Sequence, residues 1–536
     1  MEEARLNEIR QFLGKTATAT HWERIGVDRR RGICVPLFSL RSRRDCGIGD
    51  VADLRALIDW CQRLGLSVLQ ILPINDMGLD GVPYSALSAF ALDPVFIAID
   101  EVEQVAEDAS LLARVREAGE RLAPAQRVDY MEVRRTKMAL LEEAFVRADG
   151  AALQQTLFCF RADNLWLDDY LPYRVLKEVH EYRSWEDWGH LYDTAEKLRA
   201  FEEENATRFR FYCYLQWVAH QQFSAVHQYA SQKGVLLKGD IPILVARDSA
   251  DVWRHPEYFR METAAGAPPD MYSEDGQYWG FPTYDWEALA RTDYGWWRQR
   301  LQYAQRFFDL YRVDHVVGFF RIWTIQLGAE SGREGWYVPG DESTWGDHGY
   351  RLLKMMLDAT HMLPLAEDLG TIPPVCRQTL TSMGICGLKV QRWEKRWEGD
   401  GSIIPPAEYP PLSVATVSTH DSETLAGWWQ DNYEDRQQLW QFLGGDGEAP
   451  THLEGPLLRR IIQWVAASGS LFAIFMIQDL LGLFGILEGD PSHHRINVPG
   501  TVAHTNWSWR CPVTMEDLLA DDGLTQELLD SRMGST

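Results

Sequence analysis

The sequence predicts an α/β fold, namely a (β/α)8 TIM barrel with helical and loop insertions and no separate C-terminal β domain. Short apolar runs alternate with amphipathic stretches along the chain, which is typical of repeated βα units. Several of the apolar runs end in an acidic residue or a histidine. In a parallel barrel all these ends meet at one rim, where active sites lie. The length of 536 residues fits one such barrel with long insertions.

Eight apolar runs are the candidate barrel strands. They are Gly32–Leu40, Ser67–Ile74, Val235–Leu244, Phe308–Gly318, Met362–Leu369, Gly387–Trp393, Val414–Thr419 and Leu471–Leu480. Polar residues near the carboxyl ends of these runs include Asp240, Asp314, Glu367 and the pair His420–Asp421. A polar residue at the end of one strand means little, but their convergence at one rim predicts a catalytic site.

Two gaps between the predicted strands are too long for simple connections. We expect residues 103–227 to form a mostly helical insertion and residues 245–285 to form a lid loop, both within one catalytic barrel that spans 1–536. Long loops in compact domains are usually functional or disordered. The aromatic residues Tyr272, Tyr278 and Trp279 favour a functional lid over a disordered segment.

Composition narrows the class of partner. The net charge of −25 argues against nucleic acid, whose phosphates attract basic residues. The eight scattered cysteines contain no Cys-x-x-Cys pair and indicate reduced thiols. No secretory signal is visible near Met1, and the longest apolar stretch, Leu471–Leu487, is interrupted by Gln478 and Asp479. We therefore expect a cytoplasmic protein without a membrane partner.

Three acidic residues stand out by their surroundings. Asp314 lies in Tyr-Arg-Val-Asp-His, Glu367 in Leu-Ala-Glu-Asp-Leu-Gly, and Asp421 in Ser-Thr-His-Asp-Ser, each at a different predicted strand. A retaining glycosidase needs two carboxyl groups, one as nucleophile and one as general acid and then base. A third carboxylate can stabilise the positive charge of the transition state.

An ordered series of short motifs gives the strongest signal. They are Pro36-Leu-Phe-Ser-Leu40, Gly47-Ile-Gly-Asp50, Leu72-Pro73, Pro83-Tyr-Ser85, Gly239-Asp-Ile-Pro242, Arg312-Val-Asp-His315, Ala366-Glu-Asp-Leu-Gly370, Thr419-His-Asp421 and Arg495-Ile-Asn-Val-Pro-Gly500. Each is weak alone. Together they cover about Arg31 to Arg510, and the chain resembles the 4-α-glucanotransferases called amylomaltase or disproportionating enzyme, relatives of the α-amylase barrel group.

The resemblance implies a role for each matching residue. Asp314 would be the nucleophile, Glu367 the general acid/base and Asp421 the stabilising carboxylate. The remaining matches would bind substrate or shape the site. Arg312 would orient the nucleophile, His315 and His420 would contact sugar hydroxyls, Tyr84 would stack on the donor sugar, Trp279 would belong to the loop that shields the glucan, and Asp240 and Asn497 would shape the site.

The implied reaction transfers an α-1,4-glucan or glucosyl unit from a donor to the 4-hydroxyl of an acceptor. Expected partners are maltooligosaccharides, glycogen- or starch-type α-glucans and, as acceptor, glucose. We expect no cofactor, because the covalent intermediate conserves the bond energy, and no metal, because the pair His493–His494 lacks further ligands.

Two alternatives remain at this point. A hydrolase of the same fold would use water as the acceptor, although a lid that excludes water favours transfer. A non-catalytic glucan-binding protein would not need the three acidic residues.

The sequence departs from the common family pattern at two points. Val316-Val317 follows the first Asp-His, and Ser422-Glu423-Thr424 follows the later His-Asp, where many members have Asn-Asp-Thr. The run Gly318–Trp323, with Trp428-Trp429, is similar to the branch that handles maltose and branched glucans.

Overall fold

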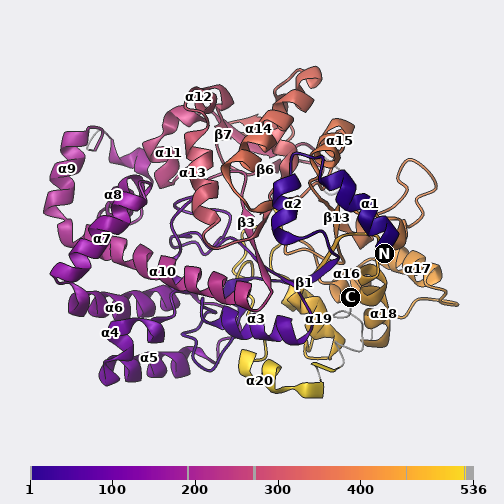
Figure 1. Ribbon diagram of the computed structural model, residues 1–536, viewed down its shortest axis with the longest axis horizontal. Helices are drawn as coiled ribbons and strands as arrows, with labels where there is room; N and C mark the ends of the chain where they lie inside the picture. The colour runs from indigo at the N-terminus through magenta and orange to yellow at the C-terminus, as the bar shows by residue number, and fades with distance from the viewer. Residues whose placement is uncertain (1–2, 190–191, 270–272, 454, 524, 527–536) are drawn as a thin grey trace.

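Eight parallel strands form one sheet at the centre of the molecule (Figure 1). The computed structural model describes residues 3–189, 192–269, 273–453, 455–523 and 525–526. The strands are β1 (Arg30–Val35), β2 (Val68–Ile71), β3 (Leu236–Ile241), β8 (Leu310–Val313), β11 (Leu363–Ala366), β12 (Gly387–Val390), β13 (Ser413–Thr416) and β14 (Phe472–Met476). Each overlaps one of the eight predicted runs, so the barrel prediction is confirmed.

The sheet closes on itself through its two outer strands. Its order is β11-β8-β3-β2-β1-β14-β13-β12, which is the chain order wrapped around a circle. The amide of Ala366 at the end of β11 donates to the carbonyl of Cys386, just before β12, at 2.8 Å. A parallel bridge between Leu365 and Cys386 joins the same two segments. The carboxyl ends of all eight strands therefore lie on one side of the barrel.

Close packing fixes which way the strand side chains point. Gly239 on β3 has no room for a side chain, because a Cβ there would lie 2.5 Å from the ring of Phe308. Its neighbours Lys238 and Asp240 are buried, 4% and 3% exposed. Since side chains alternate along a strand, these two polar residues point into the barrel.

Helices connect most of the strands. Those that follow or precede barrel strands are α3 (Asp53–Arg63), α10 (Ala206–Gln232), α12 (Trp286–Arg291), α13 (Gly295–Ala304), α14 (Trp345–Ala359), α15 (Pro374–Met383), α16 (Leu425–Asp431), α17 (Tyr433–Phe442), α18 (Gly455–Ala466), α19 (Ile477–Leu483) and, later, α20 (Met515–Ala520).

One connection departs from the regular βα pattern. Between β12 and β13 lie only two short 3₁₀ turns, η8 (Gln391–Trp393) and η9 (Pro406–Glu408).

Two N-terminal helices, α1 (Glu3–Leu13) and α2 (Ala19–Ile25), precede β1. The indole of Trp22 on α2 donates to the carbonyl of Gly384 at 2.9 Å, so α2 packs beside the start of β12.

A helical lobe lies to one side of the barrel (Figure 1). It contains α4 (Glu103–Ala106), α5 (Ala109–Leu122), α6 (Tyr130–Ala148), α7 (Ala151–Asp163), α8 (Leu167–Val179) and α9 (Ala195–Glu204), and α10 leads from it back to β3. The lobe is therefore an excursion between the second and third barrel strands.

A second, antiparallel sheet borders the carboxyl ends of the barrel. Its order is β10-β9-β5-β6, with β5 (Thr263–Ala267), β6 (Gln277–Tyr278), β9 (Ile322–Gln326) and β10 (Gly335–Val338). The short pair β4 (Phe259–Arg260) and β7 (Thr283–Tyr284) and helix α11 (Ala250–Arg254) complete this region. The segment 245–285 thus contains short regular elements, while Tyr272 lies outside the described residues.

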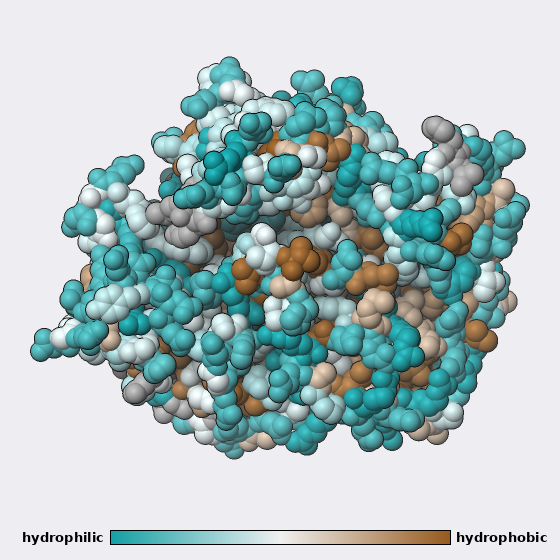
Figure 2. All heavy atoms as spheres, turned by 180° about the vertical axis from the view of Figure 1, so that it is seen from behind, coloured by the Kyte–Doolittle hydropathy of each residue, from teal (hydrophilic) through white to brown (hydrophobic). Residues whose placement is uncertain are grey.

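Figure 2 shows a mostly hydrophilic face of the molecule, with hydrophobic residues gathered around a hollow near its middle.

Candidate active site

A cavity of about 450 Å³ opens at the carboxyl ends of the barrel strands. The structure brings nearly all of the sequence-predicted site residues to its wall. These are Tyr84, Trp279, Arg312, Asp314, His315, Glu367, His420, Asp421 and Asn497. The exception is Asp240, which is 3% exposed and lies behind the wall, in contact with Tyr84 and Arg312.

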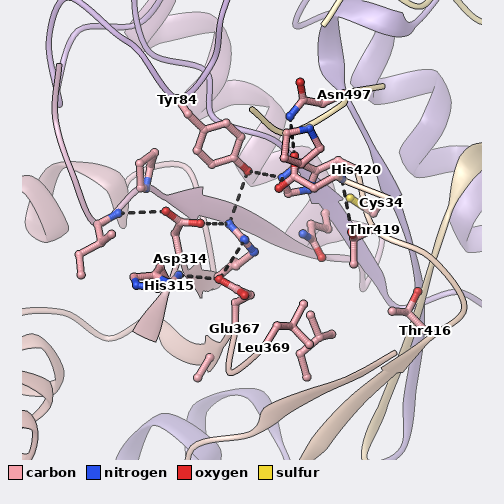
Figure 3. A pocket seen from close by; sticks show the side chains of 18 of the residues that line it. Cys34, Tyr84, Asp314, His315, Glu367, Leu369, Thr416, Thr419, His420 and Asn497 are labelled. Carbon is pink, nitrogen blue, oxygen red and sulfur yellow. Dashed lines mark hydrogen bonds and ion pairs between the residues drawn. The ribbon is translucent and has the colours of Figure 1, made fainter. Parts of the chain in front are cut away.

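Asp314 and Glu367 follow the neighbouring strands β8 and β11. The amide of Glu367 donates to the carbonyl of Val313 at 3.0 Å, so the two acidic residues leave the sheet side by side. Figure 3 shows the side chains of Asp314 and Glu367 close together in the cavity, and both contact the guanidinium of Arg312. Nη1 of Arg312 lies 2.7 Å from Oδ1 of Asp314, and Nη2 lies 3.4 Å from Oε2 of Glu367. One cation therefore contacts both carboxyl groups.

Arg312 is held by a buried network of its own. It is paired with Asp240 in the register of β8 and β3. Its Nη1 donates to both carboxylate oxygens of Asp240, at 3.0 and 3.1 Å. The hydroxyl of Tyr84 donates to Oδ2 of Asp240 at 2.7 Å, and the Tyr84 ring stacks on His420 with centroids 5.4 Å apart. The arginine and the tyrosine ring are thus fixed before any substrate binds.

Glu367 sits in an environment that favours its protonated form. Burial raises the pKa of this carboxyl to about 8, even though the positive charge of Arg312 opposes the rise. The negative charges of Asp314 and Asp421 act in the same direction as burial. At neutral pH Glu367 therefore keeps its proton, beside an Asp314 that is paired with Arg312.

His315 adopts a backbone conformation that is uncommon outside glycine. Its φ is 41°, in the left-handed region, where a side chain is strained. This turn directs its amide to Oε2 of Glu367, at 2.7 Å. Its ring meets Trp279 edge-on with centroids 5.0 Å apart. Burial lowers the pKa of His315 to about 4, so its ring is neutral at pH 7 and can donate and accept hydrogen bonds.

Asp421 lies in the cavity wall and has two partners, His420 and Asn497. Nε2 of His420 lies 3.1 Å from its Oδ2, and the amide of Asn497 donates to its Oδ1 at 2.8 Å. Its side chain is 42% exposed, so it faces the open cavity. Partial burial opposes ionisation, but His420 and Asn497 outweigh this effect and hold the pKa of Asp421 well below its usual range. Asp421 is therefore a carboxylate with room for a ligand.

Several residues of the cavity were not among the predicted site residues. The floor is formed by Cys34, Gln70 and Lys238 from β1, β2 and β3, and the ammonium of Lys238 donates to Gln70 at 2.9 Å. The alternation of side chains on β3 could have indicated Lys238, two residues before Asp240. Trp507 also lines the cavity, with its ring 5.4 Å from Tyr84. It follows the last strand, where no periodic pattern indicates its position.

Comparison with known proteins identifies the family. A family model described as 4-alpha-glucanotransferase matches residues 35–515. The chain belongs to the 4-α-glucanotransferase family. The 4-alpha-glucanotransferases of Chlamydia caviae and Chlamydia muridarum are 37% and 38% identical to it, and each alignment covers 95% of this chain and 96% of the relative.

The fold of the 4-α-glucanotransferase is also found among solved structures. The amylomaltase from Streptococcus agalactiae in complex with acarbose superimposes with a TM-score of 0.80 at 24% identity, covering 94% of this chain and 98% of that one. The resemblance expected from the sequence motifs is thus confirmed, and the chain is a 4-α-glucanotransferase. Among its described residues, no helix is long and apolar enough to cross a membrane.

Proposed function

We propose that this 4-α-glucanotransferase works by a retaining double displacement in which Asp314 is the nucleophile and Glu367 is the general acid and then the base. The observation that supports the proposal is the contact of one guanidinium with two carboxyl groups in unlike environments. Arg312 lies 2.7 Å from Asp314, whereas Glu367 lies farther from it at 3.4 Å and has its pKa raised to about 8 by burial. This separation of roles is what a retaining pair requires.

In the first step, an oxygen of Asp314 bonds to the anomeric carbon of the donor glucan. The bond between that carbon and the glycosidic oxygen breaks, and Glu367 gives its proton to the departing oxygen. In the second step, the Glu367 carboxylate takes the proton of an acceptor 4-hydroxyl. The acceptor oxygen bonds to the anomeric carbon, and Asp314 leaves as a carboxylate. Two inversions restore the α configuration.

The remaining wall residues would hold the sugar that reacts. Tyr84 presents a ring fixed by His420 and Asp240, suited to the apolar face of a pyranose. Asp421 offers an exposed carboxylate to sugar hydroxyls and to the positive charge of the transition state. Trp279 packs against His315 and would shield the intermediate from water.

The proposed substrates are maltooligosaccharides and glycogen- or starch-type α-glucans, with glucose as a small acceptor. The acarbose complex of the Streptococcus agalactiae amylomaltase, which shares the fold, supports a ligand in this cavity. The proposed location is the cytoplasm, without membrane partners, and the net charge of −25 supports the absence of a nucleic acid partner.

Incubation with maltotriose tests the reaction. Transfer gives glucose and a ladder of longer maltooligosaccharides at a constant number of reducing ends. Hydrolysis gives one new reducing end per event and forms no oligosaccharide longer than maltotriose. That outcome would refute the proposed transfer.

A mechanism-based fluorinated glucosyl donor tests the nucleophile. The label should add mass to the peptide that contains Asp314, and Asp314→Asn should fold, bind maltooligosaccharides and show almost no turnover. Labelling of Glu367 or Asp421 instead would show that the roles are assigned wrongly.

A further inference from the structure

Glu423 lies just after Asp421 and binds two arginines, one with each carboxylate oxygen. Its Oε2 accepts from Nη1 of Arg392 at 3.2 Å, and its Oε1 accepts from Nη1 of Arg495 at 2.7 Å. Arg392 lies in the 3₁₀ turn η8 that follows β12, and Arg495 lies in the segment after the last barrel strand. Glu423 therefore ties together three segments that are far apart in the sequence. Neither Glu423 nor the two arginines lines the cavity.

Arg495 uses its other nitrogens to hold the backbone on both sides of the Asp421–Asn497 hydrogen bond. Its Nη2 donates to the carbonyl of Asp421 at 3.0 Å, and its Nε donates to the carbonyl of Asn497 at 2.7 Å. The side-chain amide of Asn497 in turn donates to Oδ1 of Asp421 at 2.8 Å. One planar guanidinium thus fixes the donor and the acceptor of this bond relative to each other.

Arg392 has a different set of contacts. Its side chain is 1% exposed, and besides Glu423 it donates to the carbonyl of Val417 from Nε at 3.1 Å and from Nη2 at 3.0 Å. A buried guanidinium needs a counter-charge, so this half of the arrangement contributes to stability. The contacts of Arg495, by contrast, are with Asp421 and Asn497 of the cavity wall, so they contribute to the geometry of the site.

We propose that Glu423, acting through Arg495, is a positioning residue that sets the direction of the Asp421 carboxylate and of Asn497 in the cavity. The inference rests on the proposed function, in which Asp421 contacts the reacting sugar. It also gives a purpose to Ser422-Glu423-Thr424, one of the two points at which the sequence departs from the common family pattern.

The first test compares Glu423→Gln with a matched control. Glu423→Gln keeps the size of the side chain but removes the charge that holds Arg495. Small displacements of a catalytic group cost up to about 100-fold in rate, so we expect kcat for maltotriose disproportionation to fall roughly 10- to 100-fold, with a much smaller change in KM. Glu202→Gln removes an arginine partner from a glutamate that is equally exposed, at 35%, in the helical lobe, and should leave kcat unchanged.

A double-mutant cycle with Asp421→Asn separates positioning from general destabilisation. If Glu423 acts through Asp421, Glu423→Gln should change kcat less than about threefold once Asp421 is already Asn. The same loss of kcat in both backgrounds would overturn the inference while leaving the proposed mechanism intact. Full activity of Asp421→Asn alone would instead overturn the role proposed for Asp421.

Glu423→Gln also removes the counter-charge of Arg392, and the variant could fail to fold for that reason. Arg495→Lys is a second variant that tests the same inference. The side chain of Arg495 is 20% exposed, and lysine keeps the charge but cannot donate to three acceptors in the plane of a guanidinium. We expect Arg495→Lys to lower kcat by the same factor as Glu423→Gln, and to change kcat little when Asp421 is already Asn. Wild-type kcat in folded Arg495→Lys would refute the positioning role.

Discussion

At the scale of single residues, the site depends on one arginine between two carboxyl groups. Arg312 is itself fixed by Asp240, so its charge cannot follow either partner as the reaction proceeds. In the proposed mechanism Asp314 loses its negative charge when it forms the glycosyl ester, and one of the causes that raise the pKa of Glu367 is then lost as well. After Glu367 has given its proton to the leaving sugar in the first step, its lower pKa favours the carboxylate form. Glu367 then stays ionised until the acceptor arrives.

The first prediction concerns Glu367→Gln. Glutamine cannot protonate the leaving sugar, so we expect a loss of roughly 10²–10⁴-fold in kcat on maltooligosaccharides. A glucosyl donor with a good leaving group needs little protonation, so its first step should lose much less. Single-turnover rates with both donors check the prediction. An equal loss on both donors would argue against an acid role for Glu367.

The second prediction concerns pH. Burial raises the pKa of Glu367 to about 8, so the acid form is present below that pH and is lost as the pH rises through it. We expect kcat/KM for maltotriose to fall above about pH 8. In Glu367→Gln, the residual rate on an activated donor should lack this fall. A wild-type rate that stays constant well beyond pH 9 would show that Glu367 is not the proton donor.

The acidic residues were predictable from the sequence because each lies next to a buried apolar run. Asp314 and Glu367 each follow a strand directly, and the rim of a parallel barrel brings such positions together. Lys238 and Trp507 were not predicted. Lys238 is inside a strand, where its burial is visible only with the partners around it, and Trp507 depends on the path of the chain after the barrel.

At the scale of elements, the small sheet β10-β9-β5-β6 holds the residues that cover the cavity. Trp279 directly follows β6, and its indole donates to Gln277 at 2.9 Å. Its ring also meets His315 edge-on, so it bridges the small sheet and the barrel. In the proposed mechanism this apolar ring at the cavity wall would exclude water from the glycosyl ester.

The third prediction is that Trp279→Ala raises the share of hydrolysis. Water should compete better with the sugar acceptor, so the number of new reducing ends for each glucose released from maltotriose should rise. Trp336→Ala is the control, because Trp336 lies on the same sheet, is 46% exposed and does not line the cavity. An unchanged ratio of transfer to hydrolysis in Trp279→Ala would show that the ring does not exclude water.

The barrel strands were predictable because strands buried on both faces give continuous apolar runs. The small sheet was not, since β4, β6 and β7 are two residues long and show no periodicity. The absence of an α-helix between β12 and β13 could not be foreseen either. Nor does a local pattern reveal the contact of helix α2, from the N-terminal end of the chain, with Gly384 just before β12.

At the scale of the whole molecule, buried charges attach the helical lobe to the barrel. Asp76, just after β2, accepts from Arg174 on α8 at 3.2 Å and from the hydroxyl of Tyr170 at 2.7 Å. Arg134 on α6 donates to Asp93 at 2.9 Å. Asp76 and Asp93 are 0% exposed and Arg174 is 1% exposed. The sequence does not reveal these pairs, because the partners are 98 residues apart for Asp76 and Arg174 and 41 residues apart for Asp93 and Arg134.

The last prediction concerns this attachment. Arg174→Met leaves Asp76 buried with too little positive charge beside it, and breaking one partner of a buried pair costs about 3–5 kcal/mol. We expect denaturant unfolding to show a loss of that size. Arg114→Met is the control, because Arg114 is 47% exposed in its pair with Glu143, and such surface pairs contribute at most about 1 kcal/mol.

The double variant Arg174→Met/Asp76→Asn identifies the cause of the loss. Removing both charges removes the unpaired anion, so part of the lost stability should return, although the other contacts of Arg174 stay absent. A double variant less stable than Arg174→Met would show instead that Asp76 stabilises the protein mainly through its other partners, such as the hydroxyl of Tyr170 at 2.7 Å and the amide of Gly78 at 3.1 Å.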